Sequence, residues 1–107
     1  MSTVFKALAD PTRRRVLQLL RRGPMPAGEL ADHFDVTKPT MSAHFTVLLN
    51  ANLIEAEKHG RSITYRIKMS VLEDALLGFA DTLGLERKSK ALARRRSHRQ
   101  GSDHEPH

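Results

Sequence analysis

The hydrophobic spacing of this chain changes once, and the position of that change limits the possible folds. Up to Asn50 the apolar residues recur at helical intervals, and Met41, Phe45 and Leu48 are among the last of them. From Ser62 to Lys68 apolar residues instead alternate with polar ones, which is the period of a half-buried strand. Helices followed by a short sheet, in a chain of 107 residues, predict one small, mainly α domain.

Capping residues divide the first half of the chain into helices. Asp10 suits an N-cap and Pro11 the first helical position after it. Thr37 suits the N-cap of a later helix, and Pro39 is tolerated in the first turn of that helix. The expected helices are 2–9, 11–22, 27–34 and 38–50, and the short turn at 35–37 makes the last two a helix-turn-helix.

A hairpin and a further helix complete the expected domain. Residues 54–57 are predicted to pair with 62–68 across a turn in which Gly60 allows a positive φ. Ser70 and Glu73 have the spacing of a capping box, so the last helix is expected to begin after Ser70. The predicted fold class is mainly α with a small β-hairpin, a winged helix-turn-helix.

The net charge of +6 is unevenly distributed. Residues 87–107 hold seven Lys/Arg and two acids, a net of +5, whereas residues 1–86 hold eleven and ten, a net of +1. We therefore expect a folded domain at 1–86 and a basic, disordered tail at 87–107. DNA binding by the domain then depends on where its eleven cations lie.

Several functional classes are disfavoured by composition. The chain has no cysteine, so disulfides, thiolate metal ligands and thiol nucleophiles are excluded. Its apolar runs are too short for a membrane segment, and its first residues lack the signal-peptide pattern, so a cytoplasmic protein is expected. Neither a nucleophile–base pair nor a Gly-rich phosphate loop is present, which argues against an enzyme and a cofactor.

DNA contacts are expected on the second helix of the pair and on the hairpin. That helix, 38–50, enters the major groove by its N-terminal residues in such motifs. With Met41, Phe45 and Leu48 inward, its outward residues are small or polar, as the reading of base edges requires. An exposed basic hairpin tip suits the minor groove or the phosphate backbone. The predicted DNA-binding residues are Thr37, Lys38, Pro39, Thr40, Ser42, Ala43, His44, Lys58, His59 and Arg61.

Plainer interpretations remain open for these features. The helix has the composition of an ordinary solvated helix, and charge alone explains a soluble hairpin tip. A winged helix can also dock proteins or bind nucleic acids nonspecifically. RNA binding would require exposed stacking aromatics, whereas the only tyrosine, Tyr65, is expected in the core. Because three consecutive helical residues span ~200°, the run Arg13–Arg15 cannot form one face and is expected to be mostly solvated.

Two apolar stripes, one near each end of the domain, predict a homodimer through the N- and C-terminal helices. A domain this small has little core left to cover both stripes. Two-fold symmetry would place the two groove-reading helices about one DNA turn apart, ~34–36 Å. The predicted interface comprises Val4, Phe5 and Leu8 with Leu72, Leu76, Phe79 and Leu83, the last four spaced as an a/d seam.

Several segments, in order, resemble one family. Val4–Arg14, Ala27–Ala31 and Thr37–Phe45 resemble the helices of the ArsR/SmtB family of bacterial repressors, in its SdpR-like branch. Leu48–Ile54 resembles the junction of helix and wing in that family, and Gly60-Arg61 with Tyr65 resembles its wing. The resemblance covers residues 3–80. It implies a homodimer that represses transcription from an inverted-repeat operator in double-stranded DNA.

The chain also departs from the family pattern. Phe45 and Asn52 stand where Leu and Gly are usual; Phe45 can fill the core, and Asn tolerates the left-handed conformation. Many members sense metals through Cys on the helix matching 27–34 or through Asp, His and Glu on the last helix. Since neither pattern is present, a family-type metal site is not expected.

Overall fold

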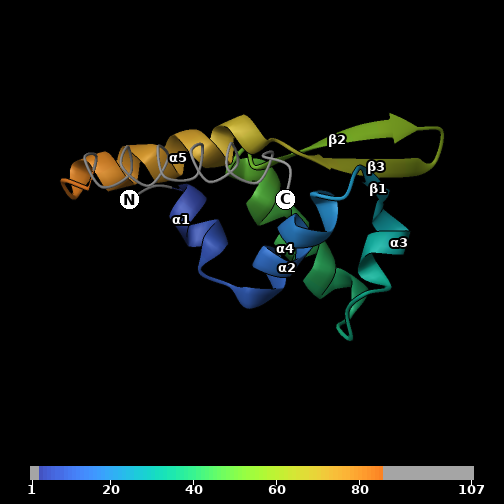
Figure 1. Ribbon diagram of the computed structural model, residues 1–107. Coiled ribbons are helices and arrows are strands. Elements are labelled where there is room, and N and C mark those ends of the chain that lie inside the picture. Colours follow the sequence, from blue (N-terminus) through green and yellow to red (C-terminus); the bar gives the residue numbers. More distant parts are fainter. Residues whose placement is uncertain (1–2, 86–107) are drawn as a thin grey trace, which may run out of the picture. The chain divides into compact units, whose positions relative to one another are not determined.

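A computed structural model describes residues 3–85 of the chain, so the prediction of a tail at 87–107 lies outside the described residues. The winged helix-turn-helix fold is confirmed (Figure 1). Residues up to Leu72 form one compact unit, and residues from Glu73 onward belong to a second. The elements are α1 (Thr3–Leu8), α2 (Pro11–Leu20), β1 (Met25–Pro26), α3 (Ala27–Ala31), α4 (Lys38–Asn50), β2 (Ile54–His59), β3 (Ser62–Ile67) and α5 (Met69–Thr82).

Helices α2 and α4 begin where their capping residues predict. The Asp10 carboxylate accepts a hydrogen bond from the backbone N–H of Arg13 at 3.1 Å, and Pro11 is the first residue of α2. The Thr37 hydroxyl accepts one from the N–H of Thr40 at 3.3 Å. These bonds satisfy N–H groups that have no partner within the helix, and they fix the start of α4.

The sheet has three antiparallel strands in the order β1-β3-β2, one more than predicted. Strand β1 pairs with β3, with Met25 opposite Tyr65 and Pro26 opposite Thr64. A two-residue segment shows no alternation of its own, and a proline, which has no N–H, argues against a strand. Pro26 is tolerated because β1 lies at the edge of the sheet.

The β2–β3 hairpin extends from Ile54 opposite Ile67 to His59 opposite Ser62. Its tip is a tight turn in which Gly60 has a φ of 62°, a conformation that favours glycine. In Figure 1 the hairpin projects beyond α3, so its tip is the wing of the winged helix.

The core of the first unit is aliphatic except for one aromatic pair. Phe45 and Tyr65 are 6% and 7% exposed, and their ring centroids lie 4.6 Å apart, which confirms that both belong to the core. Val4 is also buried, because α1 packs on α2 and α4. Val4 thus belongs to the core of a single chain, and its place in a dimer interface stays a prediction. The largest fully buried side chains are Val16, Leu19, Leu20, Leu30, Met41, Leu48, Leu53 and Ile54.

Helix α5 begins two residues earlier than the capping box predicts. It starts at Met69, and the N–H groups of Val71 and Leu72 bond to the carbonyl of Lys68. Ser70 therefore lies inside the first turn, and its prediction as the cap is wrong. The helix follows β3 with so little intervening chain that its start is set by the end of the strand.

Asn52 has the left-handed conformation expected of it, with a φ of 61°, and its side-chain oxygen accepts a hydrogen bond from Lys68 Nζ at 2.8 Å. We expect Asn52→Ala to lower the free energy of unfolding by about 1 kcal/mol, because a Cβ without a local hydrogen bond is disfavoured there. Asn52→Gly is expected to stay within about 0.5 kcal/mol of the original chain. Urea unfolding of the three chains tests this, and equal midpoints for alanine and glycine would contradict it.

Candidate nucleic-acid interface

The first turns of α4 present short polar side chains to solvent. Lys38, Thr40, Ser42 and Ala43 are all exposed. The Thr37 hydroxyl donates to Thr40 Oγ1 at 2.9 Å while it accepts the Thr40 N–H. Thr37 is thus fully used as a cap, whereas the Thr40 hydroxyl keeps its proton for an external acceptor. Thr37 therefore serves to define the start of the helix, whereas the exposed residues that follow it remain accessible to an external partner.

His44 does not point outward with the others. Only 15% of its side chain is exposed. Arg13 Nη1 lies 3.2 Å from His44 Nδ1, and because a guanidinium can only donate, Nδ1 is the acceptor. Asp10 Oδ2 lies 3.9 Å from the same nitrogen. The outward assignment is wrong because helical spacing identifies the apolar face of α4 but not which neighbouring helix covers its flank.

Arg13 and Arg14 hold the end of α1. Arg13 Nε donates to the carbonyl of Ala7 at 2.8 Å and Nη2 to that of Lys6 at 3.0 Å, while Arg14 Nη1 donates to that of Leu8 at 2.7 Å. The last four carbonyls of a helix have no partner within it, so these bonds complete α1. Arg14 and Arg15 are nevertheless exposed, which confirms that the run is mostly solvated, and Arg13 is its one half-buried member.

The Asp10 carboxylate should make stability depend on pH. Burial alone would raise its pKa, but the N–H groups of Arg13 and Thr12 and the electrostatic attraction of His44 and Arg13 hold the pKa below 3.8. Because the pKa of Asp10 is lower in the folded chain than in the unfolded chain, the ionised carboxylate stabilises the fold. Its contribution to the free energy of unfolding is complete above the unfolded-state pKa and is lost as the pH falls through the folded-state pKa. Asp10→Asn, which keeps a good cap, should flatten this acid limb in urea midpoints measured between about pH 2 and 5. An unchanged limb would contradict the assignment.

The hairpin tip carries two cations without a local acid. Arg66 Nη2 lies 3.4 Å from Glu57 Oε2, and His59 Nε2 lies 3.3 Å from Glu57 Oε1. Lys58 and Arg61 are exposed and form no ion pair within residues 3–85. Of the three predicted wing residues, Lys58 and Arg61 are thus the ones with uncompensated charge.

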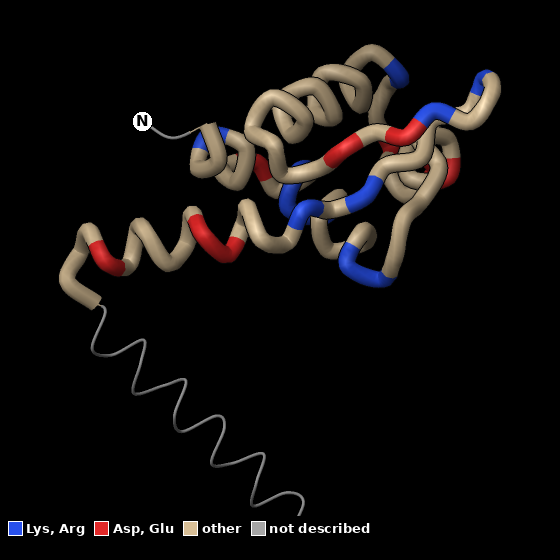
Figure 2. The backbone as a smooth tube through the Cα atoms, turned by 90° about the horizontal axis from the view of Figure 1, so that it is seen from above, with Lys and Arg blue, Asp and Glu red and all other residues tan. Residues whose placement is uncertain are grey.

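Charge separates along the chain at the end of the first unit. Residues 1–72 contain eleven Lys/Arg and six Asp/Glu, a net charge of +5, whereas α5 contains three acids and no Lys or Arg. Figure 2 shows the basic positions of the first unit spread over several of its elements, while α5 carries only acidic ones. The small net charge of residues 1–86 therefore hides the larger positive charge of the first unit, because the acids of α5 offset it. A basic unit of this kind is suited to binding a polyanion.

The described residues form neither a cluster of metal ligands nor a membrane-spanning helix. In residues 3–85 no three His, Cys, Asp or Glu side chains converge as metal ligands would. None of the helices in that part of the chain combines the length and apolarity that crossing a membrane needs.

Comparison with known proteins places these features in a family. Residues 8–57, from the end of α1 into β2, match a family model described as a helix-turn-helix domain. The chain is 43% identical over 76 residues to the transcriptional repressor SdpR of Bacillus subtilis strain 168, which covers 71% of this chain and 84% of that protein. It is 33% identical over 76 residues to an arsenical resistance operon repressor of Staphylococcus aureus, with 71% and 73% covered. A crystal structure of an ArsR family transcriptional regulator matches with a TM-score of 0.71 and 37% identity, over 78% of this chain and 86% of that one.

Proposed function

Because this chain belongs to the ArsR/SmtB family of winged helix-turn-helix regulators and is SdpR-like, we propose that it is a transcriptional repressor that binds an inverted-repeat DNA operator as a homodimer. The observation that carries this proposal is that one basic unit exposes both the polar start of α4 and two wing cations that form no ion pair with any described residue. Repression would follow from a bound dimer that blocks a promoter, including that of its own operon, and requires no metal or other cofactor.

The residues of α4 have different roles in this proposal. Lys38 contacts a guanine edge or a phosphate, Thr40 and Ser42 donate to phosphates, and Ala43 contacts a thymine methyl group. Thr37, Pro39 and His44 are assigned to positioning the helix, because the first two define its start and the third is turned toward Arg13. At the wing Lys58 and Arg61 contact the minor groove or phosphates, and His59 lies beside Glu57.

The dimer is proposed from the apolar side chains of α1, of α5 and of Leu83, which directly follows α5. Leu76, Phe79 and Leu83 are 47%, 48% and 56% exposed. Phe5 and Leu8 on α1 are partly exposed, as is Leu72. Exposed large apolar groups at the spacing of a helical seam favour burial against a second copy. Two-fold symmetry of the protein would match the symmetry of the operator.

A binding titration against the duplex upstream of the coding sequence, with a scrambled duplex of equal length as control, tests the function. We expect clear preference for the native duplex, and an affinity that falls linearly with salt on logarithmic axes because phosphate contacts release counterions. Equal affinity for both duplexes would overturn sequence-specific repression and favour a nonspecific nucleic-acid role. Absence of binding to either would favour a protein-docking role.

Arg61→Ala is expected to weaken operator binding about tenfold and to reduce the salt slope by about one per lost phosphate contact, since its charge has no acid partner in the described chain. Arg66→Ala is the matched control, because that guanidinium lies on the same hairpin but is paired with Glu57. Titrations at several salt concentrations measure both. An equal loss for the two variants would show that the hairpin acts only through its overall charge.

A further inference from the structure

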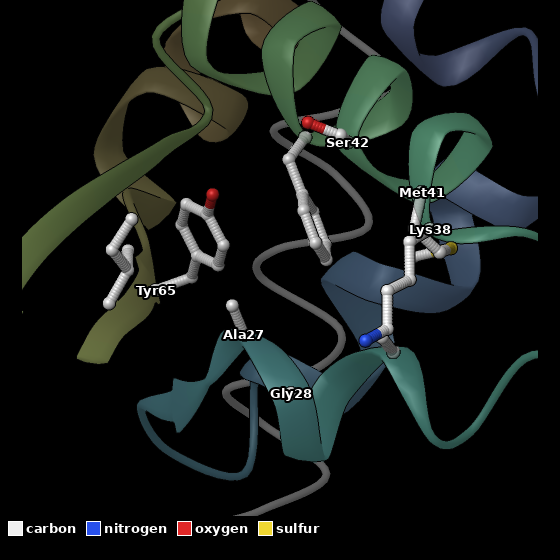
Figure 3. A pocket seen from close by; sticks show the side chains of 9 residues that line it. Ala27, Gly28, Lys38, Met41, Ser42 and Tyr65 are labelled. Atoms are coloured by element: carbon white, nitrogen blue, oxygen red, sulfur yellow. The ribbon is translucent and has the colours of Figure 1, made fainter. Parts of the chain in front are cut away.

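A pocket lies between the helix-turn-helix and the wing, entirely within the first unit. It has a volume of about 310 Å³ and is walled by α3, the first half of α4 and β3. Figure 3 shows the side chains of these three elements turned toward one space. The volume lies at the lower end of the ~300–1,000 Å³ range of small-molecule sites.

The hollow exists because α3 carries almost no side chain toward it. Ala27, Gly28 and Ala31 form that wall. A Cβ added at Gly28 would meet no atom within 4 Å, so the space beside this helix is open. Bulkier residues at these positions would fill the pocket. The opposite walls are apolar, with the rings of Phe45 and Tyr65, which are tilted by 37° to each other, and the side chains of Met41 and Ile63.

The charge at the pocket has one sign. Of its nine lining residues only Lys38 is basic, and none is an acid. Figure 3 shows the Lys38 side chain extending from α4 with its nitrogen directed toward α3. Burial raises the pKa of Tyr65, which keeps its phenol neutral. An anion with an apolar body therefore matches the pocket, whereas a cation or a polyhydroxylated molecule does not.

We propose that this pocket binds small apolar monoanions, namely aromatic or branched aliphatic carboxylates, and that their binding weakens the hold of α4 on DNA. The apolar body would lie against Phe45, Tyr65 and the small residues of α3, and the carboxylate would pair with the Lys38 ammonium. The coupling to DNA rests on the proposed function. It follows because two of the lining residues, Lys38 and Ser42, are proposed DNA contacts, and a bound anion places like charge beside phosphates.

Binding is tested first without DNA, on the full chain, by calorimetric titration with 2-naphthoate and 4-methylpentanoate. The neutral 2-naphthamide is the matched probe. We expect saturable binding of at least one acid below ~1 mM, and about threefold weaker binding of the amide, as the loss of one exposed ion pair implies. Lys38→Met should remove this preference, whereas Lys6→Met, on an exposed lysine away from the pocket, should keep it.

A filling substitution locates the site. Gly28→Leu should reduce acid binding more than tenfold, because the new side chain occupies the open space beside α3. Gly78→Leu is the control, since that position on α5 also has no atom within 4 Å of an added Cβ but does not line the pocket. Failure of both acids to bind, equal binding by Gly28→Leu, or equal binding of acid and amide would each overturn the proposal.

The last experiment tests the effect of the bound acid on DNA binding. With a duplex that the protein binds, saturating acid should weaken the affinity of the original chain about tenfold and leave that of Gly28→Leu unchanged. Acid binding without any effect on DNA would overturn the coupling. If no duplex is bound at all, the proposed function fails, while the binding arm without DNA still decides whether the pocket takes apolar anions.

Discussion

Leu76→Arg is expected to convert the proposed homodimer into monomers. The substitution removes two large apolar side chains from the interface, one per protomer, at ~1.5–3 kcal/mol each. It also brings two like charges toward the two-fold axis. A loss of about 4 kcal/mol corresponds to roughly a thousandfold increase in the dimer dissociation constant. Sedimentation at several protein concentrations measures that constant, and operator affinity should fall with it because each monomer reads only one half-site.

A control variant separates the effect of the position of the new charge on dimerisation from the effect of adding a charge. Asp81 lies ~180° around α5 from Leu72, the first residue of the seam, so Asp81→Arg adds the same guanidinium to the opposite side. That variant should remain dimeric. Because Leu76 is 47% exposed in a single chain, neither variant should lose helical circular dichroism. A Leu76→Arg protein that still sediments as a dimer would place the interface elsewhere.

The parts of the fold that were predictable are those specified by neighbours in sequence. The starts of α2 and α4 follow from Asp10 and Thr37, whose side chains bond to N–H groups three residues ahead. The φ of Asn52 follows from an asparagine at a helix-to-strand junction. Alternation around Tyr65 predicted β3 because a strand buried on one face requires it. Each of these signals acts within a few residues.

The parts that were not predictable depend on contacts between distant segments. Strand β1 exists only because Met25 and Pro26 meet β3 some 40 residues later. His44 is turned inward by Arg13, which lies 31 residues earlier in the chain. A helical period assigns an apolar face, but it does not say which helix covers the remaining flank. The exposure of the first residues of α4 was therefore predictable, whereas the inward orientation of His44, which another helix holds, was not; their contacts with DNA stay predictions.

The pocket was missed for a related reason. Ala27, Gly28 and Ala31 are ordinary helix residues in sequence, and nothing about them marks a cavity. They become a wall only when β3 and α4 face them across open space. The place of Lys38 on α4 likewise predicts a DNA contact. Its position beside an apolar pocket was not predictable, because that pocket depends on the packing of three elements.

Arg13→Met should cost about 2 kcal/mol of unfolding free energy, although the position lies on the surface side of α2. The guanidinium donates to the carbonyls of Lys6 and Ala7 and to His44 Nδ1. Hydrogen bonds from a charged group contribute ~1.5–3 kcal/mol, reduced here because the site is only partly buried. The melting temperature should fall by roughly 10 °C for a domain of this size. All variants must be compared at one protomer concentration because dimerisation shifts the midpoint.

The third arginine of the run supplies the control. Within residues 3–85 Arg15 bonds only to Gln18 Oε1, at 3.3 Å and in an exposed position, so Arg15→Met should change stability by no more than about 0.5 kcal/mol. Combining Arg13→Met with His44→Ala should cost less than the sum of the two, since the single variants remove a shared bond. Because Arg13 ties α1 to α2 and α4, the variant should also weaken operator binding through the placement of α4. Equal stability of the Arg13 and Arg15 variants would show that the hydrogen bonds of the Arg13 guanidinium contribute nothing to the free energy of unfolding.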